Sequence, residues 1–326
     1  MKVAVVILNW NGQQLLEQFL PYVIKYSTEA NVYVADNAST DDSVVFIKQN
    51  YPQVSIIQNK TNCGYAKGYN EALKKVEADV FCLLNSDIEV TKGWLSPIIS
   101  EFESETNTSI VQPKLLDYKN RSHFEYAGAG GGFIDKFGYA YCRGRIFDTI
   151  EKDIGQYNDT IPIFWASGAC LFIRKSTFEL LGGFDEAFFA HFEEIDLCWR
   201  AFNAGFTTKY IGSSCVYHIG GATLNASNPK KTYLNFRNSL FTLTKNAHGF
   251  LFSIILIRLA LDGIAGLKFL FNLKLAHFIA VLKAHFSFYR HLHRLLKQRK
   301  QLTRQKKYYK TKSIVWSYFI RKRHSY

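Results

Sequence analysis

One short segment most restricts what this chain can fold into. In residues 80–87, the apolar run Val80-Phe81-Cys82-Leu83-Leu84 leads directly into the polar run Asn85-Ser86-Asp87. A short apolar run bounded by polar residues is typical of a buried central strand in a parallel sheet. Ligands of open α/β sheets bind just beyond the carboxyl ends of such strands. A carboxylate there could hold Mg²⁺ against substrate phosphates, and an Asp in an ordinary turn is the alternative interpretation.

Apolar strand patterns alternate with helical patterns on both sides of this segment. We expect strands at residues 3–8, 32–35, 54–58 and 80–84, and helices at 13–26, 41–50, 66–76 and 92–103. Further strands are expected at 164–174 and 209–218, and further helices at 176–181 and 193–204, whereas the glycine-bearing stretch 115–162 is irregular. Such alternation predicts an α/β fold with a mostly parallel sheet flanked by helices.

Polar clusters follow each of the first four predicted strands. They are Asn9-Trp10-Asn11-Gly12, Asp36-Asn37-Ala38-Ser39-Thr40-Asp41, Asn62-Cys63-Gly64-Tyr65-Ala66-Lys67-Gly68-Tyr69-Asn70 and Asn85-Ser86-Asp87. The carboxyl ends of parallel strands share one edge of a sheet, so these clusters predict a nucleotide pocket at that edge. Asp36 could accept from a base or ribose donor, while glycines allow close backbone approach and helix amides favour phosphate.

The charge of the chain is placed very unevenly. Residues 263–326 contain 16 Lys or Arg and no Asp or Glu, and the whole chain carries +13, which leaves −3 for residues 1–262. A polycationic segment can meet nucleic acid or an anionic membrane surface, and composition does not choose between them.

The pattern is helical from about residue 233 to the end. Its longest uninterrupted apolar run, residues 249–257, is too short to span a bilayer. Around residues 288–299, apolar side chains form a stripe with basic residues among them, which is typical of an interfacial helix. The alternative is a helical cap that packs on the preceding domain and exposes its basic faces to water.

The cysteines and the first residues indicate the compartment. The six cysteines include no CxxC pair, and Cys82, Cys170 and Cys215 lie in apolar strand-like runs. We therefore expect a reducing compartment and no zinc site. Met1-Lys2-Val3 runs straight into a predicted strand, so we expect no cleavable signal and a cytoplasmic location.

Taken together, these motifs resemble those of the inverting family 2 glycosyltransferases, which have the GT-A fold. The resemblance covers residues 3 to about 246 and is nearest to the rhamnosyltransferase-like branch that builds bacterial surface polysaccharides. Three later motifs contribute to it: Gly182-Gly183-Phe184-Asp185-Glu186, Phe192-Glu193-Glu194-Ile195-Asp196-Leu197 and His218-Ile219-Gly220-Gly221. The resemblance implies a metal-dependent, hexosyltransferase-type enzyme with a nucleotide-diphosphate sugar donor and a glycan or lipid-linked acceptor.

The resemblance also implies roles on the donor side. Asp36 matches the position that binds the base, and Asp87 matches the carboxylate that holds Mg²⁺ or Mn²⁺. Asn85 stands where a full DxD motif has its first Asp, so Asp87 could be the sole carboxylate on the cation. His218 matches a histidine that can complete the metal or diphosphate site, and a histidine that merely closes a strand is the alternative. The expected donor-binding residues are Asn9, Asn11, Asp36, Asn37, Asn62, Gly64, Lys67, Asn70, Asn85 and Ser86.

On the acceptor side, the resemblance places the catalytic base at Glu194, with Glu193 and Asp196 as alternatives. A base is needed because a sugar hydroxyl is a poor nucleophile until its proton is removed. Acids at a helix start also favour the macrodipole without any catalytic role. Arg143 and Arg145 are interpreted as surface arginines of a loop, with contact to the diphosphate as the other possibility.

We expect a GT-A domain over residues 1–232, with a nucleotide-binding half at about 1–114 and an acceptor half at about 115–232. Residues 233–326 would form a basic helical extension on the inner face of the cytoplasmic membrane, with no nucleic-acid partner. A sugar-phosphate nucleotidyltransferase and a nucleic-acid-binding protein are the rival hypotheses. The sugar, the base, the acceptor and the oligomeric state stay open.

Overall fold

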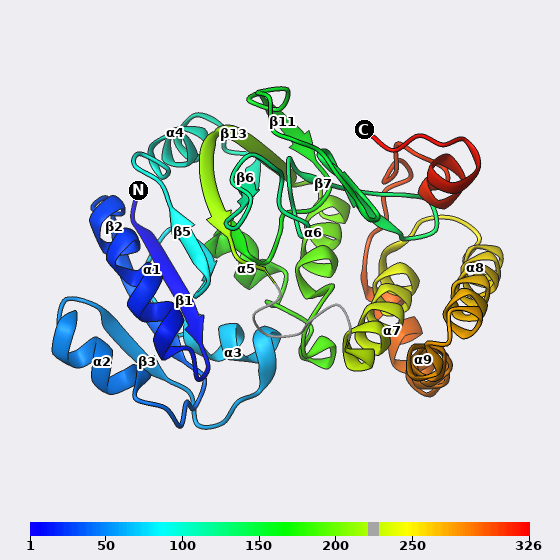
Figure 1. The fold of residues 1–326 in the computed structure, drawn as a ribbon, viewed down its shortest axis with the longest axis horizontal. Coiled ribbons are helices and arrows are strands. Elements are labelled where there is room, and N and C mark those ends of the chain that lie inside the picture. Colours follow the sequence, from blue (N-terminus) through cyan, green and yellow to red (C-terminus); the bar gives the residue numbers. More distant parts are fainter. Residues whose placement is uncertain (221–227) are drawn as a thin grey trace.

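A computed structural model describes residues 1–220 and 228–326 of the chain. Within these residues, the centre of the molecule is a nine-stranded mixed sheet with helices packed on both faces (Figure 1). The strand order is β11-β13-β6-β12-β4-β1-β2-β3, and β5 pairs with β13 at one side. The α/β fold expected from the sequence is confirmed.

The first half of the sheet is parallel and follows the predicted alternation. It contains β1 (Val3–Asn9), β2 (Ala30–Asp36), β3 (Ser55–Gln58) and β4 (Val80–Asn85), connected by α1 (Gln13–Tyr26), α2 (Ser43–Asn50) and α3 (Gly64–Leu73). Alternate residues of β1 face opposite layers, as a strand requires: Val5 joins the core beneath α1, and Val6 joins the core that includes α3.

The second half of the sheet is mixed. Strand β4 is parallel to β1 but antiparallel to β12 (Cys170–Arg174), so it is central without being parallel on both sides. Beyond β12 lie β6 (Thr108–Asp117) and β13 (Thr207–His218), which are parallel to each other. The remaining elements of this region are β5 (Ile88–Val90), α4 (Ser96–Ser104), β11 (Thr160–Ile163), α5 (Lys175–Leu180), the 3-10 helix η1 (Glu186–Phe188) and α6 (Glu193–Asn203).

Two expectations about the middle of the chain are wrong. The strand expected at 164–174 begins only at Cys170, because Trp165 turns its indole to the carbonyl oxygen of Phe133 and Ser167 donates its backbone N–H to Gln112. The stretch expected to be irregular holds a four-stranded sheet of β7 (Gly132–Ile134), β8 (Ala140–Cys142), β9 (Arg145–Ile146) and β10 (Thr149–Ile150).

The arginines of this small sheet are buried rather than on the surface. Arg143 makes a bidentate ion pair with Asp159 at 2.8 and 2.9 Å, and Arg145 donates to the carbonyl oxygen of Tyr126. Both guanidinium groups therefore bind groups of the protein itself.

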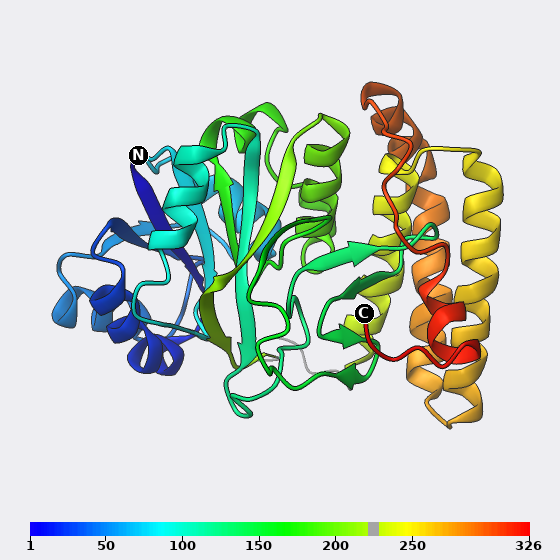
Figure 2. The same ribbon diagram turned by 90° about the horizontal axis from the view of Figure 1, so that it is seen from above.

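The C-terminal helices pack on the α/β body at the side away from β1, β2 and β3 (Figure 2). These are α7 (Pro229–Asn246), α8 (Leu251–Phe271) and α9 (Leu275–Gln301), followed by the short π-helix η2 (Trp316–Ile320). Phe188 of the body shares a buried cluster with Phe241 of α7 and Phe288 of α9. The extension is thus joined to the body through a core, and the division at residue 232 stays a prediction. None of the described helices has the length and apolarity that crossing a membrane would require.

Candidate active site

The ends of β1 and β2 bring part of the predicted donor site together. Asn9 and Asp36 are opposite each other in the sheet, and the Asn9 amide donates to the Asp36 carboxylate at 3.3 Å and to the Ser39 hydroxyl at 3.1 Å. Asn11 accepts from the backbone N–H of Thr40 at 2.7 Å. The Oδ1 atom of Asn9 is buried and has no hydrogen-bond partner among the described residues. Hydrogen bonds therefore join the first two polar clusters at one edge of the sheet, and Oδ1 of Asn9 is an acceptor without a partner among the described residues.

A second group of donor-site residues lies beside the first. Asn37 donates to Asn62 at 2.9 Å and to the carbonyl oxygen of Gly64 at 3.2 Å. Gly64 opens α3 with φ +78°, and a β-carbon there would lie 2.6 Å from the carbonyl oxygen of Phe189. Glycine is thus required by both the backbone conformation and the close approach of the two chains.

Two residues that were expected to bind the nucleotide-sugar donor have their side chains engaged elsewhere. Asn70 clamps Phe184 by donating to its carbonyl at 2.9 Å and accepting from its N–H at 2.9 Å. Lys67 forms a half-exposed ion pair with Glu186 at 3.6 Å. Both side chains connect α3 to the segment before α6, so the structure gives them a part in holding the two halves together.

Asn85, Ser86 and Asp87 lie where β4 ends, as the sequence predicts, and Asp87 faces His218 from the end of β13. The Asp87 carboxylate is 3.2 Å from Nε2 of His218, and the Glu125 carboxylate is 3.2 Å from Nδ1. All three side chains are at most 7% exposed. The Nδ1 contact is close enough for an ion pair but is not aligned as a hydrogen bond. A histidine therefore sits between two buried carboxylates.

Charge explains this arrangement. Burial alone would lower the pKa of His218, but Glu125 and Asp87 raise it to about 10. The imidazole is therefore a cation at neutral pH and balances the two carboxylates. Gly220 lies against the Glu125 carboxylate. Gly221, the last residue of the motif that begins at His218, lies outside the described residues.

The donor set at this position fits a hard divalent cation. Across residues 1–220 and 228–326, no three His, Cys, Asp or Glu side chains form a complete metal cage. Mg²⁺ and Mn²⁺ accept few protein ligands when substrate phosphates supply the rest. Asp87 and Nε2 of His218 lie 3.2 Å apart and would be the two protein ligands once Nε2 has lost its proton, and Glu125 beside Nδ1 is the outer partner that a metal-binding histidine commonly has.

The candidate bases stand at the start of α6. Glu193 is 5% exposed and Glu194 is half-buried, and each has one buried carboxylate oxygen without a hydrogen-bond partner among the described residues. Burial raises the pKa of Glu194 to about 7, and burial together with the charge of Glu194 raises the pKa of Glu193. A carboxylate with a pKa near neutrality suits proton abstraction at physiological pH.

Gly168 places Glu194 near the end of β4. A β-carbon on Gly168 would lie 3.1 Å from the Tyr65 hydroxyl and 3.8 Å from Cβ of Glu194. The Tyr65 hydroxyl donates to the Gly168 carbonyl at 2.8 Å, and the neighbouring Ala169 carbonyl accepts from Asn85 at 2.9 Å. One turn therefore connects the strand end that precedes Asp87 to the helix start that carries Glu194.

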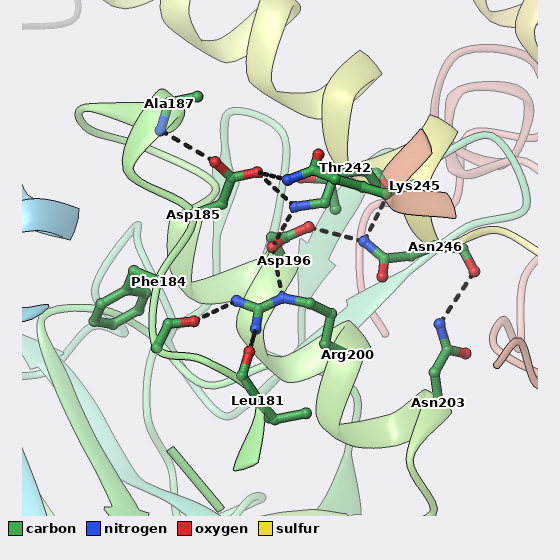
Figure 3. A network of polar contacts seen from close by, with 12 residues as sticks. Leu181, Phe184, Asp185, Ala187, Asp196, Arg200, Asn203, Thr242, Lys245 and Asn246 are labelled. Carbon is green, nitrogen blue, oxygen red and sulfur yellow. Dashed lines mark hydrogen bonds and ion pairs between the residues drawn. The ribbon is translucent and has the colours of Figure 1, made fainter. Parts of the chain in front are cut away.

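Asp196 is occupied by a structural network (Figure 3). It is fully buried and accepts from Arg200 at 2.9 Å, from Lys245 at 2.9 Å and from Asn246 at 2.8 Å. The three donors take up the lone pairs that a base would need. We therefore keep Glu194 and Glu193 as the candidate bases.

The loop before α6 is strained and is held by α7. Phe189, His191 and Phe192 have φ of 64°, 69° and 72°, a left-handed conformation that costs energy in residues with a β-carbon. Asn238 of α7 points its amide nitrogen at the carbonyls of Phe188, Ala190 and His191, at 3.1, 2.9 and 2.7 Å. The C-terminal helices therefore fix the segment that positions Glu193 and Glu194.

Several residues of this site escaped the sequence analysis. Glu125 lies in the glycine-bearing stretch with no neighbouring motif, and Asn238 lies in a helix without a local signal. Tyr65 belongs to a named motif and Gly168 lies in a stretch expected to be a strand, but only the folded chain brings them to Glu194. Covariation between distant positions is the kind of signal that finds such pairs.

The chain is similar in sequence to known glycosyltransferases. The model of glycosyl transferase family 2 matches residues 4–181, which is more than half of the chain. An N-acetylglucosaminyl-diphospho-decaprenol L-rhamnosyltransferase of Mycobacterium tuberculosis (strain CDC 1551 / Oshkosh) is 26% identical over 234 residues, which cover 66% of this chain and 75% of that protein. Rhamnosyltransferase WbbL of Escherichia coli (strain K12) is 24% identical over 227 residues, which cover 66% of this chain and 83% of that protein.

A solved structure shares the fold. The mannosyltransferase PcManGT from Pyrobaculum calidifontis, in complex with GDP-Man and Mn²⁺, superposes with a TM-score of 0.56 at 12% identity, over 88% of this chain and 86% of that chain. At this identity the likeness concerns the fold alone.

Proposed function

Because this chain belongs to glycosyl transferase family 2, we propose that it transfers a sugar from a nucleotide-diphosphate donor with inversion. The acceptor is a hydroxyl of a glycan or of a lipid-linked saccharide, in the synthesis of a bacterial surface polysaccharide. The names of the relatives in Mycobacterium tuberculosis and Escherichia coli support a rhamnosyltransferase-like reaction.

The observation that carries the proposal is the placement of Glu194. It stands at a helix start beside Gly168, in the turn before β12 that hydrogen-bonds to the end of β4, with a shielded carboxylate oxygen and a pKa raised by burial. Glu194 takes the proton from the acceptor hydroxyl, and the resulting oxygen nucleophile attacks the anomeric carbon from the face opposite the nucleotide. The bond to the diphosphate breaks in the same displacement, so the configuration inverts.

The donor lies across the ends of β1, β2 and β4. The Asp36 carboxylate binds the base or ribose, and the Asn9 amide orients it by donating a hydrogen bond at 3.3 Å. The segment from Asn62 to Gly64 brings backbone amides at the start of α3 towards phosphate, where a helix N-terminus favours negative charge.

Asp87 and His218 would hold a divalent cation, Mg²⁺ or Mn²⁺, which would neutralise charge on the leaving diphosphate. For His218 to bind the metal, the metal ion would replace the proton on Nε2, and Glu125 would favour the proton that remains on Nδ1. The neutral Asn85 at the first position of the motif makes Asp87 the carboxylate of this pair.

A lipid-linked acceptor implies a place on the inner face of the cytoplasmic membrane. The basic helical extension supports this, because exposed apolar side chains on α8 and α9 stand among lysines and arginines. The extension also packs on the body. The same helices can therefore cap the body and lie on a membrane surface.

Donor turnover tests this function. The full chain is incubated with a panel of nucleotide sugars and Mn²⁺ or Mg²⁺, and nucleotide release is measured with wild type and Asp87→Ala. We expect release from one donor class, lost in Asp87→Ala and in EDTA. Release that persists in EDTA and in Asp87→Ala would contradict the metal assignment, and no release from any donor would contradict the transferase proposal.

A further inference from the structure

The turn between α8 and α9 exposes two large apolar side chains to an unusual degree. Leu273 is 93% exposed and Phe271 is 82% exposed, the highest values for any large apolar side chain in the described part of the molecule. Figure 2 shows the turn at one end of the helical hairpin, at the lower edge of the view. Isolated apolar residues on a surface are normal. The residues around Phe271 and Leu273 therefore decide whether the turn is a binding surface.

The backbone of Leu273 is strained where its side chain is exposed. The N–H of Lys274 bonds the carbonyl of Phe269 at 2.9 Å, and the N–H of Leu273 bonds the carbonyl of Leu270 at 3.0 Å, which completes a Schellman motif. Leu273 takes φ +58°, the position that such a motif usually gives to glycine. A leucine there is unfavourable for the folded chain alone, and it buries nothing within it. This combination indicates a partner outside the chain.

Exposed apolar residues continue from the turn along both helices. On α8 they include Ile264 and Leu267, and on α9 they include Leu275, Leu282 and Phe286, with exposures between 48% and 65%. Exposed lysines, Lys268, Lys274 and Lys283, stand among them. No acid occurs from residue 263 to the end. The exposed charged residues of α8 and α9 are thus all basic, and apolar side chains among basic ones match an anionic lipid leaflet.

Charge also argues against a second copy of the chain as the partner of this surface. A second copy of the chain would bring the same basic region, with 16 positive residues and no acids, against the first. Like charges in contact are unfavourable, whereas each basic residue gains from an anionic lipid surface.

We propose that residues 271–275 insert into the headgroup region of an anionic bilayer. Phe271 and Leu273 reach the acyl boundary, and Lys268 and Lys274 contact lipid phosphates. The inference rests on the membrane position in the proposed function, and it names the segment that enters the lipid.

Vesicle flotation with the full chain tests the inference. Vesicles of phosphatidylcholine with phosphatidylglycerol are compared with vesicles of phosphatidylcholine alone. We expect wild type to float with the anionic vesicles and Leu273→Asp to lose most of this binding. Ile154→Asp is the matched control, because Ile154 is 80% exposed but lies in a loop of the body. It should float like wild type.

Leu273→Gly separates membrane binding from folding. Glycine accepts the positive φ without strain, so this variant should melt at a higher temperature than wild type and yet float less. A structural role for the leucine predicts the opposite change in melting temperature.

Flotation of Leu273→Asp equal to that of wild type would overturn the inference, as would a wild type that does not float. A wild type that forms dimers lost in Leu273→Asp, without flotation, would assign the turn to self-association. Nucleotide release in solution without vesicles reports the transferase separately, and it should be unchanged in Leu273→Asp.

Discussion

Asp185 and Asp196 share one buried cation, the Nζ of Lys245, at 2.8 and 2.9 Å. The two carboxylates belong to separate motifs of the body, and Lys245 belongs to α7 (Figure 3). Arg294 of α9 adds a contact to Asp185 at 3.2 Å. The acidic motifs thus serve partly to fasten the C-terminal helices to the helix that carries Glu194.

Replacing Lys245 by methionine keeps much of the side-chain volume and leaves two buried carboxylates without their shared cation. We expect Lys245→Met to lower the free energy of unfolding by about 3–5 kcal/mol, the usual scale for breaking a buried ion pair. Denaturant titration measures this loss. Lys175→Met is the control, because Lys175 pairs with a largely exposed Glu77, and such surface pairs contribute at most about 1 kcal/mol. Equal losses in the two variants would refute the assigned role.

The same contact predicts that stability falls in acid. Burial would raise the pKa of Asp185, but Lys245 and Arg294 lower it below its ordinary value. The stabilisation is therefore present above the unfolded-state pKa of about 3.9 and is lost as pH falls below it. We expect the acid loss of stability to be shallower in Asp185→Asn than in wild type, as followed by melting temperature against pH. An unchanged slope would argue against this contact.

Activity should rise with pH through the titration of Glu194. Burial raises the pKa of this carboxyl to about 7, and it can accept a proton only when ionised. We expect kcat/KM to increase as pH rises through about 7, at saturating metal. The profile is measured with wild type and with Glu194→Asp, which keeps a carboxylate in a different position and should move the midpoint. A profile of wild type that is flat through this pH would contradict the assignment.

Glu125 should act on the cation through His218. We expect Glu125→Gln to weaken Mn²⁺ affinity by about 10- to 100-fold, as loss of an outer-shell partner commonly does. The readout is the Mn²⁺ concentration that gives half-maximal nucleotide release. Glu89→Gln is the matched control, because Glu89 is a buried carboxylate near Asp87 that pairs with Arg121 at 2.8 Å. Its metal dependence should stay that of wild type, and the same shift in both variants would count against a specific role of Glu125.

Asn238 should support the strained loop before α6. Asn238→Asp keeps the shape but removes the donors that face the carbonyls of Phe188, Ala190 and His191. We expect a loss of about 1–3 kcal/mol in stability, because buried acceptors lose their partner, together with reduced turnover. Asn235→Ala on the same helix serves as the control. Unaltered stability and turnover in Asn238→Asp would show that the loop keeps its conformation without the Asn238 amide.

The sequence predicts best what local chemistry decides. Helix α1 begins and ends where its pattern predicts, because Asn11-Gly12 breaks the preceding strand and an apolar stripe follows. Strands β1 and β4 are predictable for a similar reason, since their side chains form apolar runs that end in a polar residue. The polar ends of β1 and β2 then follow from topology, which brings Asn9 opposite Asp36.

What the sequence does not predict depends on partners far along the chain. Strand β6 was missed because Gln112 and Lys114 interrupt its apolar pattern, and the structure satisfies them with Ser167 and Asp153. Glu125 has no local motif, and only the pairing of β6 with β13 brings its region to His218. Lys67 and Asn70 share a motif with donor-site residues, yet their side chains contact Glu186 and Phe184, in the segment before α6.

The central claim is that Glu194 is the base of an inverting transfer, and Glu194→Gln tests it most directly. Product formation from the active donor and its acceptor is measured side by side for wild type, Glu194→Gln, Glu193→Gln and Asp196→Asn, with nucleotide affinity as the folding control. We predict that Glu194→Gln lowers transfer by about 10²-fold or more while nucleotide affinity hardly changes. Near wild-type transfer by Glu194→Gln, with a comparable loss in Glu193→Gln or Asp196→Asn instead, would contradict the account.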